Sequence, residues 1–127
     1  MCNDREFEMY LKFRNYIDRL FFPVYSCDCI IIGAYEGVQE VGFICVIDGY
    51  IEGIWIEPEY RRQGRARQLV IDYISEYGMP DRLHILNNNI PAKRFWSSIF
   101  ILEKVQETNI DALYCITGLK ESVKIDK

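Results

Sequence analysis

The chain has 127 residues, of which 50% are hydrophobic and 27% charged, and its formal net charge is −4. This length fits one domain spanning residues 1–127, and the composition provides enough apolar residues to bury a core. An acidic protein lacks the basic surface on which general nucleic-acid binding depends. We therefore expect a single folded domain, either a monomer or a homodimer, with no nucleic-acid partner.

Membrane and metal-binding proteins are also disfavoured. No apolar run approaches the ~18 residues that a membrane span needs, and the N-terminus MCNDREFEMY lacks a basic-then-apolar signal peptide. The five cysteines are an odd number without a C-x-x-C pair, which suits a reducing compartment. Cys27 and Cys29 have no further Cys or His at ligand spacing. We expect no membrane span, no metal site and a cytoplasmic location.

The first predicted elements are a helix followed by three strands. Asn3 and Glu6 have capping-box spacing, and apolar residues recur at helical intervals up to Pro23. The runs CDCIIIGAYE and VGFICVID, separated by EGVQE, predict antiparallel strands joined by a hairpin. The segment GYIEGIWIEPEY predicts a third strand, which Pro58 closes. Glu57 and Glu59, on either side of this proline, are expected to be solvated loop residues.

A helix, a strand, a second helix and two closing strands are predicted after this loop. Apolar positions at i, i+3, i+4, i+7 and i+11 from Ala66 predict an amphipathic helix that ends at Gly78 and Pro80. RLHIL predicts a strand, NIPAKRFWSSIF a short helix with Asn89 near its cap, and ILEKVQETNIDALYCITGL two strands around TNID. The pattern indicates an α/β domain without an internal boundary.

The stretch EPEYRRQGRARQLV joins the third strand to the following helix and carries Arg61, Arg62, Arg65 and Arg67. A helix N-terminus exposes unpaired N–H groups and roughly +0.5 of an elementary charge, so a basic turn there can hold a phosphate. Gly64 and Ala66 keep bulky side chains away from these amides. Neither a P-loop nor a dinucleotide-binding motif is present. We interpret the stretch as an anion clamp; the alternative is a solvated arginine face.

Residues 61–66, RRQGRA, match the [RQ]-x-x-G-x-[GA] signature of the GNAT superfamily of N-acetyltransferases. The flanking segment IWIEPEYRRQGRARQLVIDYI resembles that family's strand, loop, signature and helix, and residues 89–96, NIPAKRFW, resemble its second motif. The resemblance covers about residues 30–105. Within the superfamily, GYIEGIWIEPEYRRQG looks most like the aminoglycoside N-acetyltransferases.

The resemblance implies a mixed, mostly antiparallel central sheet with splayed middle strands and flanking helices. Acetyl-CoA would lie between the strand that ends at Ile56 and the strand RLHIL. The backbone of residues 54–56 would pair with the pantetheine arm, residues 62–67 would hold the pyrophosphate, and Asn89 would help to fix the pantetheine. The implied cofactor-binding residues are Ile54, Trp55, Ile56, Arg61, Arg62, Gln63, Gly64, Arg65, Ala66, Arg67, Asn89 and Trp96.

Glu52 and Trp96 are the candidate catalytic residues. A protonated amine must lose a proton before it attacks a thioester, and Glu52 resembles a substrate-side glutamate of the aminoglycoside branch. The alternative for Glu52 is an exposed strand glutamate. Trp96 stands where many family members have a tyrosine that is thought to protonate the leaving thiolate, and an indole N–H only donates a hydrogen bond. His84, in the predicted strand, is expected to be structural.

Three explanations of Trp96 remain open. Trp96 stabilises the thiolate while a water supplies the proton, another tyrosine supplies it, or the protein is a weak enzyme or a CoA-binding remnant. We expect an acetyl-CoA-dependent N-acetyltransferase that acts by direct transfer in a ternary complex on a cationic small amine, aminoglycoside-like or polyamine-like. The alternatives are a protein lysine or N-terminal amine as acceptor, a non-catalytic CoA-binding module, and nucleic-acid binding through the arginines.

Overall fold

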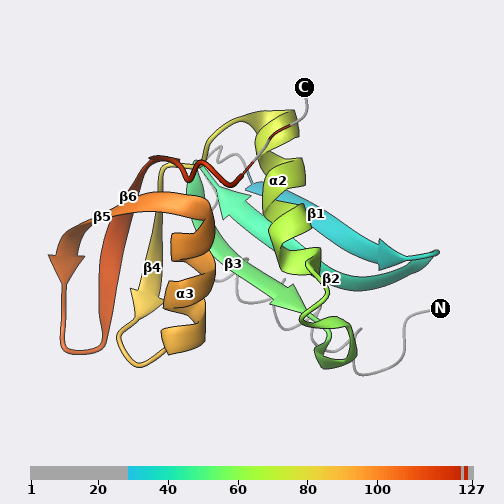
Figure 1. The fold of residues 1–127 in the computed structure, drawn as a ribbon, viewed down its shortest axis with the longest axis horizontal. Coiled ribbons are helices and arrows are strands. Elements are labelled where there is room, and N and C mark those ends of the chain that lie inside the picture. The colour runs from blue at the N-terminus through green and yellow to red at the C-terminus, as the bar shows by residue number, and fades with distance from the viewer. Residues whose placement is uncertain (1–28, 124, 126–127) are drawn as a thin grey trace, which may run out of the picture.

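The computed structural model describes residues 29–123 and residue 125, so the predicted N-terminal helix lies outside the described residues. The other predicted elements are all present and occur in the predicted order (Figure 1). In chain order they are β1 (Cys29–Glu36), β2 (Gln39–Ile47), β3 (Tyr50–Ile56), the 3-10 helix η1 (Pro58–Tyr60), α2 (Arg65–Tyr77), β4 (Arg82–Leu86), α3 (Ile90–Ile99), β5 (Phe100–Glu107) and β6 (Asp111–Leu119).

The strands form one six-stranded sheet in the order β1-β2-β3-β4-β6-β5. Every neighbouring pair is antiparallel except β3 and β4, which are parallel. Helices α2 and α3 lie on the same face of this sheet (Figure 1). The predicted α/β fold with a mostly antiparallel sheet is therefore confirmed. In the described part of the chain, neither helix has the length and apolar character to cross a membrane.

The middle of the sheet is splayed. β3 and β4 pair only at Tyr50 with Arg82 and at Ile51 with Leu83. Beyond these pairs the two strands diverge, and their carboxyl ends point apart in Figure 1. β4 remains paired with β6 along its length, while β3 remains paired with β2 up to Ile56. Beyond Ile51, this backbone edge of β3 therefore faces the opening between the strands. Its N–H and C=O groups can pair there with an extended ligand.

One hydrophobic core lies between the helices and the sheet. The apolar stripe predicted for α2 is buried, because Leu69, Val70, Tyr73 and Ile74 all pack into this core. α3 contributes Trp96 and Ile99, and the sheet contributes the buried residues Ile44, Val46, Ile51, Ile56, Leu83 and Ile85. Since β2 is buried at every residue from 41 to 47, it is covered on both faces. The core thus fixes α2 and α3 on either side of the splayed opening.

Candidate functional site

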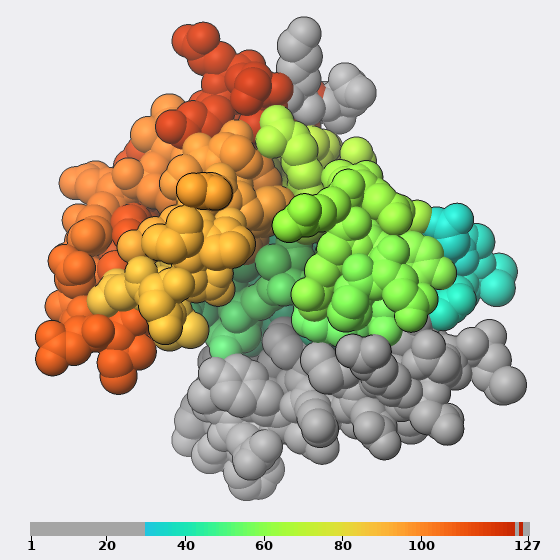
Figure 2. All heavy atoms as spheres, turned by 60° about the horizontal axis from the view of Figure 1, so that its bottom comes forward, coloured from blue at the N-terminus to red at the C-terminus, as the bar shows by residue number. Residues whose placement is uncertain are grey.

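Two adjoining cavities form a groove where β3 ends. Their volumes are about 320 Å³ and about 310 Å³, and both are lined by Ile56, Arg61, Ala66 and Phe95. In Figure 2, α2 and α3 stand on the two sides of a depression, with β3 visible at its floor. We call these two cavities together the groove. The groove lies at the carboxyl end of β3, beside the N-terminus of α2, and no residue of β4 lines either cavity.

The N-terminus of α2 opens into the groove without a side-chain cap. Gly64 occupies the N-cap position with φ of 79° and has no side chain to accept from the first N–H groups. The first backbone bond of the helix joins the N–H of Gln68 to the carbonyl oxygen of Gly64, over 2.9 Å. The N–H groups of residues 65–67 precede that bond, so this helix end offers donors to an anion. The first turn contains no acidic residue to occupy them.

α3 provides a contrast within the same fold. Its N-cap, Asn89, accepts a hydrogen bond from the N–H of Ala92 through its side-chain oxygen, over 3.1 Å. This is the usual way in which an asparagine satisfies the first turn of a helix. The side-chain oxygen of Asn89 is therefore used to cap α3. Asn89 lines neither cavity of the groove.

All four arginines of the predicted clamp line the larger cavity: Arg61, Arg62, Arg65 and Arg67. Their side chains have different partners. Arg61 donates through Nε to the carbonyl oxygen of Ile56 over 2.7 Å, at the end of β3. Arg65 forms an ion pair with Glu36 and is directed toward the β1–β2 hairpin. Arg62 has φ of 62°, which is uncommon for a residue with a side chain.

The smaller cavity has mostly apolar walls, and we call it the apolar channel. Ile54, Trp55 and Ile56 line it from β3, and Trp96 lines it from α3. Trp96 is only 6% exposed, and its ring stacks on Phe100 with centroids 6.0 Å apart. It is therefore a core residue as well as a wall of the groove.

Two further predicted residues, Glu52 and Gln63, do not line the groove. Glu52 is half-buried. It lies in a bulge of β3, because Gly53 pairs with Cys45 while Ile51 pairs with the adjacent Val46. The side-chain oxygen of Gln63 accepts a hydrogen bond from Nε of Arg65 over 3.4 Å.

Other residues of the site differ from the sequence analysis. The expectation that Glu57 is solvated is wrong: it is 1% exposed, and its N–H bonds to the carbonyl oxygen of Val41 over 2.7 Å. This bond holds the residue after β3 against a buried part of β2. Phe95, which lines both cavities, was missed as a site residue, although it belongs to the segment NIPAKRFW.

His84 projects from an exposed position of β4, and its Nδ1 lies 2.7 Å from the hydroxyl of Tyr50. The described residues contain no group of three or more His, Cys, Asp or Glu that could hold a metal ion.

The fold thus places an uncapped helix end and an apolar channel side by side at the end of β3. The profile of the acetyltransferase (GNAT) family matches residues 3–100, so the chain belongs to this family. A comparison with curated proteins gives no match.

Solved structures agree on the fold. Arabidopsis thaliana NAA60, crystallised with a bisubstrate analogue, is 19% identical with a TM-score of 0.54, over 85% of this chain and 93% of that chain. The solution structure of apo YjaB from Escherichia coli is 20% identical with a TM-score of 0.53, over 84% of this chain and 77% of that chain. At these identities the likeness concerns the fold alone, and it selects no branch of the family.

Proposed function

We propose that the protein is an N-acetyltransferase that uses acetyl-CoA and transfers the acetyl group directly to a primary amine in a ternary complex. The observation that carries this proposal is the groove. One end has the uncapped N-terminus of α2 with arginines around it, and the other end is an apolar channel between β3 and α3. CoA is divided in a corresponding way, because its anionic pyrophosphate is joined to a long neutral pantetheine arm.

The residues present fit this donor. The N–H groups of residues 65–67, with Arg62 and Arg67, would hold the pyrophosphate through charge-assisted hydrogen bonds. A side chain at Gly64 would meet no atom within 4 Å, so the turn leaves open space for a phosphate. The backbone edge of β3 near Ile54 would pair with the amides of the pantetheine arm. Acetyl-CoA supplies the acetyl group as an activated thioester.

The protein's own residues then act on the acceptor amine and on the leaving group. Glu52 would accept the proton of the amine, a step for which a positioned carboxylate typically contributes ~10²–10⁴ in rate. The indole N–H of Trp96 would donate a hydrogen bond to the departing thiolate, and a water molecule would supply its proton. The new amide bond forms as the bond between the acetyl carbon and sulfur breaks.

We infer that the acceptor is a cationic small molecule, similar to an aminoglycoside or a polyamine. Support comes from the net charge of −4, from Glu52, and from the segment GYIEGIWIEPEYRRQG. An acidic protein raises the local concentration of a cationic substrate.

The test is release of free thiol from acetyl-CoA in the presence of aminoglycosides, polyamines or peptides with a free N-terminus or lysine. We expect release with at least one cationic small amine. Release with peptides alone would move the acceptor class to proteins. Binding of CoA without release in the presence of any amine would instead support a non-catalytic CoA-binding module.

A further inference from the structure

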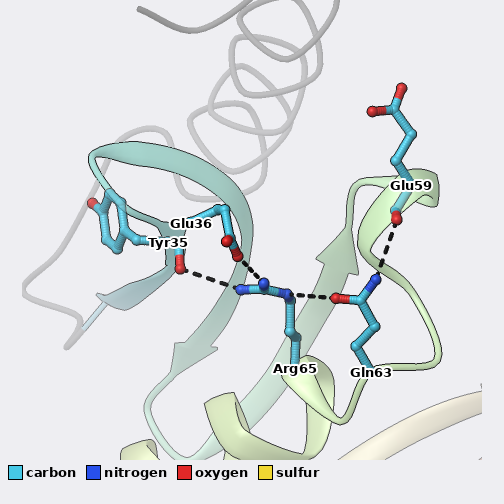
Figure 3. Close-up of polar contacts among 5 residues, drawn as sticks. All are labelled: Tyr35, Glu36, Glu59, Gln63 and Arg65. Carbon is cyan, nitrogen blue, oxygen red and sulfur yellow. Dashed lines mark hydrogen bonds and ion pairs between the residues drawn. The ribbon is translucent and has the colours of Figure 1, made fainter.

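Arg65 belongs to the predicted clamp by sequence, but its side chain is held by the β1–β2 hairpin (Figure 3). Its Nη2 pairs with the carboxylate of Glu36, and its Nη1 donates to the carbonyl oxygen of Tyr35 over 3.2 Å. Its guanidinium carbon also lies 5.2 Å from the centroid of the Tyr60 ring. We call the contacts of Arg65 with Tyr35 and Glu36 the hairpin latch.

The hairpin latch continues across the basic turn. Nε of Arg65 donates to the side-chain oxygen of Gln63 over 3.4 Å, and the amide nitrogen of Gln63 donates to the carbonyl oxygen of Glu59 over 3.5 Å. Figure 3 shows this chain of contacts running from the hairpin through Arg65 and Gln63 to η1. The contacts therefore connect the two ends of the turn, residues 61–64, to a strand pair far away in the sequence.

The turn needs such a restraint. Arg62 and Gly64 both have left-handed backbone conformations, with φ of 62° and 79°. All residues from 61 to 64 are exposed, so burial does not hold them in place. A left-handed conformation costs a residue with a side chain free energy, and it persists only where surrounding contacts enforce it.

The same contacts make Arg65 a poor ligand for a phosphate. Its Nε, Nη1 and Nη2 atoms each already donate to a protein acceptor. The carboxylate of Glu36 also neutralises the charge of the guanidinium. A carboxylate close to an anion site would weaken anion binding if it were not paired in this way. This arrangement is explained if Glu36 holds Arg65 rather than competing with the ligand for it.

We propose that Arg65 is a positioning residue. Through Glu36 and Tyr35 it fixes the turn 61–64 and the first N–H groups of α2 in the arrangement that receives the pyrophosphate, without binding the phosphates itself. This inference rests on the proposed function of the groove. Preorganising a binding turn increases affinity because less conformational entropy is lost on binding.

The two possible roles of Arg65, phosphate ligand or positioning residue, predict opposite effects of Glu36→Gln on CoA affinity. If Arg65 bound the pyrophosphate directly, removal of the competing carboxylate would leave CoA affinity unchanged or increase it. The hairpin latch predicts instead that Glu36→Gln and Arg65→Gln each weaken CoA binding by a similar factor, about fivefold or more, as for coupled sites. The double variant is expected to bind no worse than either single variant, because both remove the same contact.

Calorimetric titration of the full chain with CoA and with pantetheine separates the outcomes. We expect pantetheine, which lacks the pyrophosphate, to bind both variants as it binds the unchanged protein. Glu36→Asp, which keeps the charge but shortens the side chain, should weaken CoA binding as the glutamine variant does. Glu76→Gln, an exposed glutamate on α2, is the charge-matched control and should change nothing.

Two results would overturn the inference: CoA affinity that is equal or higher in Glu36→Gln, or an equal loss of affinity for CoA and pantetheine. Failure of the unchanged protein to bind CoA would instead reject the proposed function. Circular dichroism of each variant establishes that the comparison is made between folded proteins.

Discussion

Arg61 donates a hydrogen bond from Nε to the carbonyl oxygen of Ile56 over 2.7 Å, and both residues line both cavities of the groove. The bond ties the first arginine of the clamp to the last residue of β3. One side chain therefore joins the wall of the apolar channel to the proposed pyrophosphate site.

We predict that Arg61→Ala weakens CoA binding by about tenfold, because hydrogen bonds to charged groups contribute about 1.5–3 kcal/mol. The change removes both a positive charge and the bond that holds the end of β3. Titration calorimetry measures the loss. Arg94→Ala is the matched control, since Arg94 is an exposed arginine of α3 that lines neither cavity. Equal affinities of the two variants would remove Arg61 from the site.

Gly64→Ala should lower both stability and CoA affinity. At φ of 79°, a residue with a side chain is strained even though no atom lies within 4 Å of the added carbon. We expect a loss of ~1 kcal/mol in the free energy of unfolding, measured by urea titration.

Gly78→Ala provides the control for this substitution. Gly78 has φ of 91° and equally open surroundings, but it lies at the C-terminal end of α2, away from the cavity walls. Its alanine variant should lose a similar stability while keeping CoA affinity. If both variants lose affinity equally, the effect of Gly64 is one of general destabilisation.

Local patterns in the sequence were sufficient for most elements of the fold. The β-branched and aromatic run VGFICVID and the helical spacing from Ala66 predicted β2 and α2, since both elements contribute to one core. The splay of β3 and β4 came from the family resemblance, and the structure confirms it with only two paired positions. The sequence pattern within a strand does not show where its pairing with a neighbouring strand ends.

The residues of the candidate site were named from the sequence, but their contacts with distant parts of the chain were not. Arg65 has the expected sequence spacing, but Glu36, 29 residues earlier, determines where its side chain points. Glu57 is buried against β2, a contact that the loop sequence around Pro58 does not reveal. The capping role of Asn89, by contrast, could be read from the sequence, because asparagine before a helix commonly caps it.

Glu52→Gln tests the proposed general base. We predict that turnover falls by ~10²–10⁴ when the carboxylate is lost. CoA affinity should remain unchanged, because Glu52 lines neither cavity. The measurement is thiol release at saturating acetyl-CoA, with the acceptor identified by the amine screen. Glu59→Gln, an exposed glutamate in η1, serves as the control. Turnover equal to that of the unchanged protein would exclude Glu52 from the mechanism.

Trp96→Phe separates the hydrogen-bonding role of the indole from its packing role. Phenylalanine keeps an aromatic ring against Phe100 but removes the N–H. If this N–H stabilises the thiolate, turnover should fall about tenfold or more while CoA still binds, since hydrogen bonds to charged groups contribute about 1.5–3 kcal/mol. Trp96→Tyr, which restores a donor, should recover turnover. Binding of CoA with no thiol release by any of these proteins would identify a non-catalytic module.

The central claim is that the N-terminus of α2 holds the pyrophosphate of CoA. The most direct measurement is a nuclear magnetic resonance titration of ¹⁵N-labelled protein, first with pantetheine and then with CoA. We predict that the amide signals of Arg65, Ala66 and Arg67 move with CoA and remain in place with pantetheine, whereas those of Ile54 and Trp55 move with both. If CoA at millimolar concentration leaves the three amides of α2 unmoved, the account of this site is contradicted.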